Sequence, residues 1–265
     1  MSCGEWIPGP FGLDGARGRT VRCERTILVV VHSVTTGTRL VDIMPLVESD
    51  RRVQVTYTAC PLSMFAAGVP EFLASLGGVV IPWAQTTQTR FDLAVAASGG
   101  GLEQVHAPVL TVPHGAGFSK YPSVWPGPGP AADRELRETD SGRLVYHGRV
   151  TAAGIVVATT GQLERLRRGC PPAAAVAVIA GDPCLDRLAA SLPLRDAYRQ
   201  DLGTGGRTLV AVSSTWGPGS LLEQHPDLLP RLVDELPADQ YQLAVITHPN
   251  IWYWHGGRQV RAWYA

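Results

Sequence analysis

The chain has 265 residues, of which 45% are hydrophobic, and its 23 basic residues balance 23 acidic ones. This hydrophobic share supports a folded core and excludes wholesale disorder. Balanced charge argues against a nucleic-acid coat protein. The longest aliphatic run, from Ala173 to Ala180, is far shorter than the about 20 residues that a membrane-spanning helix needs.

The cysteines and the N-terminal residues predict a cytoplasmic protein. The five cysteines contain no CxxC pair, which argues against a disulfide framework or a zinc cluster. Residues 1–24 have no apolar core of a secretion signal and are predicted to form a flexible lead. Lys120 is the only lysine among the 23 basic residues. The resulting arginine excess, with abundant Ala, Gly and Pro, is typical of a high-GC bacterium.

Strand and helix patterns alternate from residue 25 onward. Strands are predicted at 26–31, 53–58, 79–82, 92–97, 109–112, 155–158 and 176–180, and helices at 37–47, 70–76, 161–168 and 184–191. The β-branched run TILVVV at the first strand is typical of a strand buried on both faces. The alternation predicts an N-terminal Rossmann-like α/β domain over 25–192, with a mostly parallel sheet.

A second, shorter α/β pattern begins after residue 192. It has predicted strands at 208–213 and 242–247, and a predicted helix at 221–236. The last fourteen residues hold Trp252, Tyr253, Trp254, Trp263 and Tyr264, large aromatic side chains that need a core. We interpret 193–265 as an incomplete second Rossmann-like domain; the alternative is that the aromatics pack back on the first domain.

Ligands of open α/β sheets bind beyond the carboxyl ends of the strands, so the residues that follow the strands are the site candidates. His32 follows the first strand, and the three glycines at 99–101 follow the fourth, where they form either an anion cradle or a plain turn. His114 follows the fifth strand. It is placed to act as a general base, since an imidazole accepts a proton near neutral pH. Lys120, six residues later, is a candidate phosphate ligand.

Later strand ends supply further candidates. Asp186 lies in the first turn of the helix after the seventh strand, where an acidic residue also favours the helix dipole. Ser213, Ser214 and Thr215 follow the first strand of the second pattern, and His248 follows the next strand. The remaining histidines share no ligand spacing, so no metal site is predicted.

Four motifs in order resemble the CDP-glycerol glycerophosphotransferases, a family of the GT-B superfamily. They are HGAGFSK at 114–120, GDPCLDRL at 181–188, VAVSSTW at 210–216 and ITHPN at 246–250. The resemblance implies two Rossmann-like domains and a nucleotide-activated donor, either CDP-glycerol or a nucleotide sugar. It implies no cofactor, and leaves room for peripheral contact with a membrane.

The resemblance also implies residue roles. His114 would deprotonate an acceptor hydroxyl, with Gly115 and Lys120 in the same motif and Asp186 near the base. Ser213, Ser214, Thr215 and His248 would hold the donor phosphates.

Two departures from the family pattern leave other functions open. Cys184 stands where the family usually has arginine, and the chain ends before the family's later donor-binding motif. The alternatives are an isomerase similar to the nucleotide-sugar 2-epimerases, or an inactive fragment that serves as a binding module.

Overall fold

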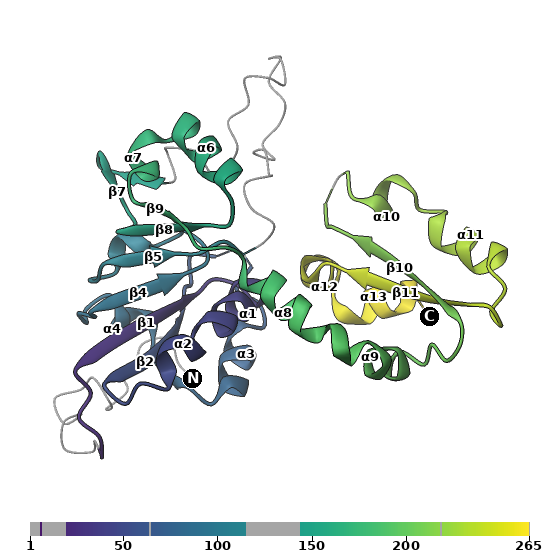
Figure 1. Ribbon diagram of the computed structural model, residues 1–265, viewed down its shortest axis with the longest axis horizontal. Helices are drawn as coiled ribbons and strands as arrows, with labels where there is room; N and C mark the ends of the chain where they lie inside the picture. Colours follow the sequence, from purple (N-terminus) through teal and green to yellow (C-terminus); the bar gives the residue numbers. More distant parts are fainter. Residues whose placement is uncertain (1–5, 7–19, 64, 115–143, 218, 265) are drawn as a thin grey trace. The chain divides into compact units, whose positions relative to one another are not determined.

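The computed structural model describes residues 6, 20–63, 65–114, 144–217 and 219–264, and it divides into two compact units, Met1–Cys184 and Leu185–Ala265 (Figure 1). Gly115, Lys120 and most of the predicted lead at 1–24 lie outside the described residues. The domain boundary predicted at 192/193 stays a prediction.

A parallel sheet forms the framework of the first unit. Its described strands run in the spatial order β3-β2-β1-β4-β5-β8-β9, and every neighbouring pair is parallel. Their bounds are β1 Arg25–Val31, β2 Val53–Ala59, β3 Val79–Val80, β4 Leu93–Ala96, β5 Val109–Thr111, β8 Gly154–Val157 and β9 Ala177–Ile179. All seven strands predicted for this domain are confirmed. From β1 the chain adds β2 and β3 on one side of the sheet and then returns to add β4 on the other side, so the strand order changes between β1 and β4.

Strand β1 is central because both of its faces are covered. Val29 and Val31 pack into one core with the helices α1 (Val34–Ile43) and α3 (Val69–Leu76). Leu28 and Val30 pack into a second core on the opposite face. These four side chains are at most 1% exposed, as the β-branched run predicts.

Proline breaks two predicted helices. The helix predicted over 37–47 is instead α1 followed by α2 (Pro45–Glu48), and the helix predicted over 221–236 is α10 (Leu221–Gln224) followed by α11 (Leu228–Glu235). Pro45 is the first residue of α2, and Pro226 lies between α10 and α11. Because proline has no N–H and its ring collides with the preceding turn, each helix ends before it. The two predictions were wrong at these points.

The other elements of the first unit lie around the sheet. The helix predicted at 70–76 is confirmed as α3, and the helix predicted at 161–168 as α6 (Thr160–Gly169). The remaining elements are α4 Trp83–Thr86, the 3-10 turn η1 Leu102–Gln104, α7 Pro171–Ala174 and the hairpin strands β6 Val145–Tyr146 and β7 Arg149–Val150. A third core joins β8 to α6.

The second unit is built on one parallel strand pair, β10 (Thr208–Ser214) and β11 (Tyr241–Thr247). Its described helices are α8 Pro183–Ser191, which crosses the division between the units, η3 Leu192–Leu194, α9 Arg195–Asp201, α10, α11, α12 Pro249–His255 and α13 Gly257–Trp263. The C-terminal aromatics remain between 38% and 54% exposed. The core of this unit is therefore small.

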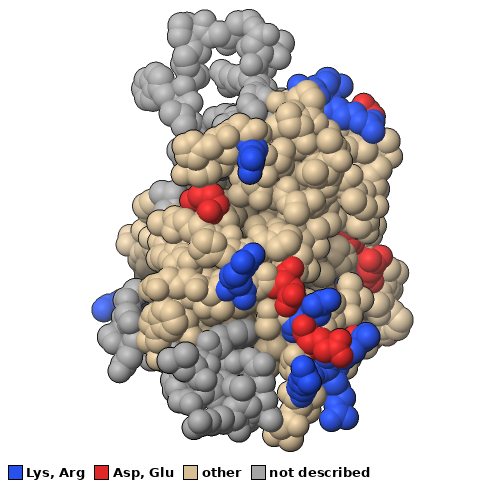
Figure 2. All heavy atoms as spheres, turned by 90° about the vertical axis from the view of Figure 1, so that its left-hand side faces the viewer, with Lys and Arg blue, Asp and Glu red and all other residues tan. Residues whose placement is uncertain are grey.

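Two surface properties bear on partners. Among the described residues, none of the helices is both long and apolar enough to cross a membrane. On the face shown in Figure 2, the basic and acidic side chains of the described residues are interspersed rather than gathered into a patch of one sign.

Candidate functional site

The carboxyl ends of β1, β4 and β5 bring the first group of candidates together. These three strands are neighbours, with Val30 paired to Ala96 and Ala96 paired to Thr111. His32 is the first residue after β1, and His114 is the third residue after β5. The loop that follows β4, Ala97–Gly101, starts between these two chain segments. We refer to it as the β4 loop.

The backbone of the β4 loop orients His114. Nδ1 of His114 lies 2.5 Å from the carbonyl oxygen of Ala97, and the His114 side chain is exposed. A carbonyl oxygen can only accept a hydrogen bond, so the ring nitrogen must be the donor. In the neutral ring the lone pair is then on Nε2. This is the tautomer that a general base needs when its other nitrogen is held by the protein.

His32 contacts the same loop. Its Nε2 lies 2.6 Å from the carbonyl oxygen of Gly100, and by the same argument donates to it. His32 is 3% exposed, and burial lowers its pKa, because an imidazolium loses more hydration energy than a neutral ring. The proximity of His114 lowers the pKa of His32 further. His32 is therefore neutral at pH 7.

Close packing holds the end of the β4 loop. Gly101 has φ +76°, in the left-handed region, and a Cβ atom there would lie 3.1 Å from Leu62 and Trp83 and 3.2 Å from the Cys60 sulfur. Only glycine fits both the backbone conformation and the space. Tight packing is confined to Gly101, because Gly99 and Gly100 are exposed and have no atom closer than 3.9 Å to a built Cβ. The choice between an anion cradle and a plain turn stays open.

The second group of candidates lies at the carboxyl ends of β10 and β11. Ser214 pairs with Thr247, and the backbone N–H of His248 donates to the Ser214 carbonyl oxygen at 3.2 Å. The structure therefore brings His248 beside the Ser213–Thr215 segment. Ser213 and Thr215 are exposed, and Ser214 is buried. The Ser214 hydroxyl donates to the Thr215 carbonyl and accepts from the N–H of Leu222, so it stabilises the turn.

His248 has the opposite tautomer to His114. Its Nδ1 accepts a hydrogen bond from the backbone N–H of Asn250 at 3.1 Å, so the proton of the neutral ring is on Nε2. The half-buried ring also lies 6.1 Å, centroid to centroid, from Trp216. An Nε2–H donor suits a phosphate oxygen, whereas an Nε2 lone pair does not.

Asp186 lies apart from both groups along the chain. It is exposed in the first turn of α8 and belongs to the second unit, whereas His114 belongs to the first. The preceding Asp182 accepts a hydrogen bond from the N–H of Cys184 at 2.9 Å and so helps to begin the helix. Catalytic support by Asp186 stays a prediction.

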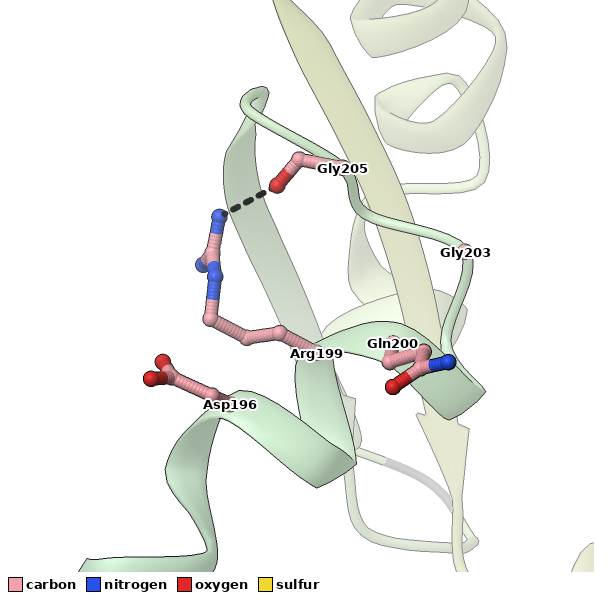
Figure 3. A pocket seen from close by; sticks show the side chains of 5 residues that line it. All are labelled: Asp196, Arg199, Gln200, Gly203 and Gly205. Carbon is pink, nitrogen blue, oxygen red and sulfur yellow. Dashed lines mark hydrogen bonds between the residues drawn. The ribbon is translucent and has the colours of Figure 1, made fainter.

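A pocket of the second unit lies near the amino end of β10, opposite the carboxyl end that holds Ser213–Thr215. Asp196, Arg199, Gln200, Gly203 and Gly205 line it (Figure 3). The Arg199 guanidinium donates to the carbonyl oxygens of Arg207, at 2.7 Å, and Gly205, at 3.4 Å. These contacts stabilise the turn before β10, at the amino end of the strand. Ligands of parallel sheets bind at the carboxyl ends, so this pocket is not a candidate site.

Metal and disulfide chemistry find no support in the part of the chain that the structure describes. No three metal-ligating side chains cluster there, and the described cysteines Cys23, Cys60, Cys170 and Cys184 are free thiols.

Comparison with known proteins shows the fold. No family model matches the chain, and no curated protein matches it. Among solved structures it is similar to MnaA from S. aureus bound to UDP, with a TM-score of 0.54 and 11% identity over 84% of this chain and 63% of that one. It is also similar to the wall teichoic acid polymerase TagF, with a TM-score of 0.51 and 13% identity over 87% and 57%.

A third similar structure is the UDP-N-acetylglucosamine 2-epimerase from Rickettsia bellii, with a TM-score of 0.51 and 11% identity over 86% of this chain and 63% of that one. The chain therefore spans less than two thirds of the length of each of these neighbours. The large parallel sheet and these neighbours establish a GT-B-like α/β fold.

Proposed function

We propose that the protein is a cytoplasmic, nucleotide-dependent transferase of GT-B type that moves a group from CDP-glycerol or a nucleotide sugar to an acceptor hydroxyl. The observation that carries the proposal is the 2.5 Å hydrogen bond between His114 Nδ1 and the Ala97 carbonyl. This bond leaves the lone pair of the neutral ring on Nε2, beyond the carboxyl ends of the strands.

His114 is the general base of the proposed reaction. Its Nε2 takes the proton of the acceptor hydroxyl while the hydroxyl oxygen attacks the phosphorus next to glycerol in CDP-glycerol. The bond from that phosphorus to the CMP oxygen breaks, and CMP leaves with the electron pair. With a nucleotide sugar, the same oxygen attacks the anomeric carbon, and the nucleoside diphosphate leaves. Positioning and charge stabilisation supply most of the rate enhancement in such transfers.

The second group of residues holds the donor in this proposal. The Nε2–H of His248 and the exposed hydroxyls of Ser213 and Thr215 donate to the donor phosphates, and Ser214 keeps the turn in place. Gly115 and Lys120 complete the His114 motif on the acceptor side, and Asp186 supports the base. The roles of Gly115, Lys120 and Asp186 are supported by the motif order alone. The roles of Ser214 and His248 are also supported by the hydrogen bonds at the ends of β10 and β11.

Replacement of His114 tests the base directly. The His114→Ala variant is expected to lose about 10²–10⁴-fold in kcat/KM, the usual contribution of a general base. His106→Ala is the matched control, because His106 is an exposed histidine of the same unit. The assay follows CMP or nucleoside diphosphate release from CDP-glycerol and UDP-sugars with polyol acceptors. Unchanged turnover in His114→Ala would overturn the assignment of the base.

A nucleotide-sugar 2-epimerase is the second candidate function. It is favoured by the similarity to the R. bellii epimerase. Incubation of UDP-N-acetylglucosamine without any acceptor separates the two, because only an isomerase forms an epimer under these conditions. A folded protein that turns over no donor and binds no nucleotide in calorimetry would instead support a binding module of other specificity.

A further inference from the structure

Two histidines donate to the backbone of one short loop. His114 Nδ1 bonds the Ala97 carbonyl at the start of the β4 loop, and His32 Nε2 bonds the Gly100 carbonyl near its end. The two rings come from strands on opposite sides of β4 in the sheet. The β4 loop therefore connects them mechanically.

His32 is suited to a fixed rather than a titrating role. Its Nδ1 is buried and has no hydrogen-bond partner among the described residues. The nearby carbonyls of Gly100 and Val30 favour the protonated ring, but burial outweighs them, because an imidazolium that is 3% exposed loses its hydration. Burial lowers the pKa of His32 accordingly. The ring stays neutral near pH 7, with its single proton directed at Gly100.

The Gly100 carbonyl depends on this donor for its direction. Gly100 itself is exposed, so a carbonyl without a protein donor would turn towards water. The other described side chain that reaches this oxygen is the Cys60 thiol, whose sulfur lies 3.5 Å away. A thiol is a weak donor, whereas an imidazole N–H at 2.6 Å makes a strong hydrogen bond.

We infer that His32 is a positioning residue for His114: it fixes the β4 loop through Gly100, and the loop in turn presents the Ala97 carbonyl that selects the His114 tautomer with the lone pair on Nε2. This inference rests on the proposed function for its catalytic meaning, since a fixed tautomer matters only if His114 is the base. The geometric part is tested without substrate.

The test compares two amides at position 32 that differ by one methylene. In His32→Gln the amide nitrogen reaches the place of the imidazole Nε2 and keeps the donor to Gly100. In His32→Asn the amide nitrogen falls short of that place and the donor is lost. Cys60→Ala is the control, because it removes the weak contact to the same oxygen. Long-range proton–nitrogen NMR spectra of the ¹⁵N-histidine-labelled full chain report the tautomer of each ring.

We expect the His114 signals to show a proton on Nδ1 in the wild type, in His32→Gln and in Cys60→Ala. In His32→Asn we expect them to move towards the average of both tautomers. Turnover, measured separately, should fall by up to about 100-fold in His32→Asn, the usual effect of a misplaced catalytic group, and recover in His32→Gln.

Three outcomes contradict the inference. They are an unchanged His114 tautomer in a folded His32→Asn variant, an equal change in Cys60→Ala, and a failure of His32→Gln to restore the wild-type spectrum. If circular dichroism shows that His32→Asn does not fold, His32→Phe replaces it, because it keeps the ring volume without the donor. Failure of the proposed function would show in a different result. His114→Ala would then retain turnover, whereas the histidine spectra report only on the link between His32 and His114.

Discussion

Gly101 is the position at which the packing of the β4 loop can be tested most sharply. An alanine there is expected to destabilise the first unit by about 2–5 kcal/mol. About 1–2 kcal/mol comes from the left-handed backbone, which a Cβ atom disfavours. A further about 1–3 kcal/mol comes from overpacking. The added atom would lie 3.1–3.2 Å from its neighbours. Leu62 is exposed and can move aside, whereas Cys60 is buried and cannot.

Gly77→Ala is the matched control. Gly77 also has positive φ, +67°, but nothing lies within 4 Å of a Cβ atom built on it. It should therefore lose only the backbone contribution, about 1–2 kcal/mol. The measurement is urea unfolding of both variants, followed by circular dichroism, with the free energy of unfolding compared at equal slope. If the two variants lie within about 0.5 kcal/mol of one another, the packing argument at Gly101 is refuted.

Three further predictions concern charge and donor binding. Asp92 accepts from the N–H and hydroxyl of Thr26 at 2.8 and 3.0 Å, and the Thr26 N–H chiefly lowers the pKa of Asp92. This stabilisation is present above the unfolded pKa of about 3.9 and is lost as pH falls through the folded value. Asp92→Asn should cost about 1 kcal/mol at pH 7, discounted because the side chain is 42% exposed, and should flatten the acid-unfolding profile. The pKa of His32 is lowered, so the unfolded chain binds more protons and the free energy of unfolding falls as pH drops below about 6.5. Urea titrations at pH 5 and 7 measure this fall, which should be smaller in His32→Gln than in the wild type. An equal fall in both proteins would contradict the prediction. His248→Ala should weaken nucleotide binding by about 10–100-fold in calorimetry, and His225→Ala, an exposed histidine of the same unit, should not.

The sheet of the first unit could be predicted because its strands lie in the interior. A strand buried on both faces must be apolar along its whole length, and Thr26–Val31 shows this directly. The strand ends then predicted where His114, Ser213 and His248 lie. The two helix errors were avoidable, because Pro45 and Pro226 each mark a break that proline chemistry requires.

The role of His32 could not be read from the sequence. It depends on the strand order, in which β4 lies between β1 and β5, and on the path of the β4 loop back towards β1. Strand order and loop path both depend on contacts between residues far apart in the sequence, so no short stretch of sequence indicates them. The sequence did single out His32 as a residue that follows a strand, yet nothing in its neighbours indicated a backbone carbonyl as its partner. The hairpin of β6 and β7 was also missed, although its turn at His147 and Gly148, both with positive φ, has a readable glycine.

The tautomers of His114 and His248 likewise follow from backbone contacts. His114 Nδ1 faces a carbonyl and His248 Nδ1 faces an N–H, so the same residue type offers a lone pair in one unit and a donor in the other. A sequence motif does not show which ring nitrogen of a histidine carries the proton. The two proposed roles, a general base in the first unit and a hydrogen-bond donor to phosphate in the second, therefore depend on these backbone contacts.

Phosphorus NMR of the protein with CDP-glycerol and, separately, with UDP-N-acetylglucosamine tests whether the protein is a transferase with His114 as its base. Each donor is incubated with polyol acceptors, and His114→Ala serves as the comparison. We expect CMP to accumulate together with a new phosphodiester signal when CDP-glycerol is the donor, and UDP to accumulate when UDP-N-acetylglucosamine is the donor; His114→Ala should abolish this accumulation. Donor signals that remain unchanged in the wild type, or an epimer formed without acceptor, would contradict a transferase with His114 as its base.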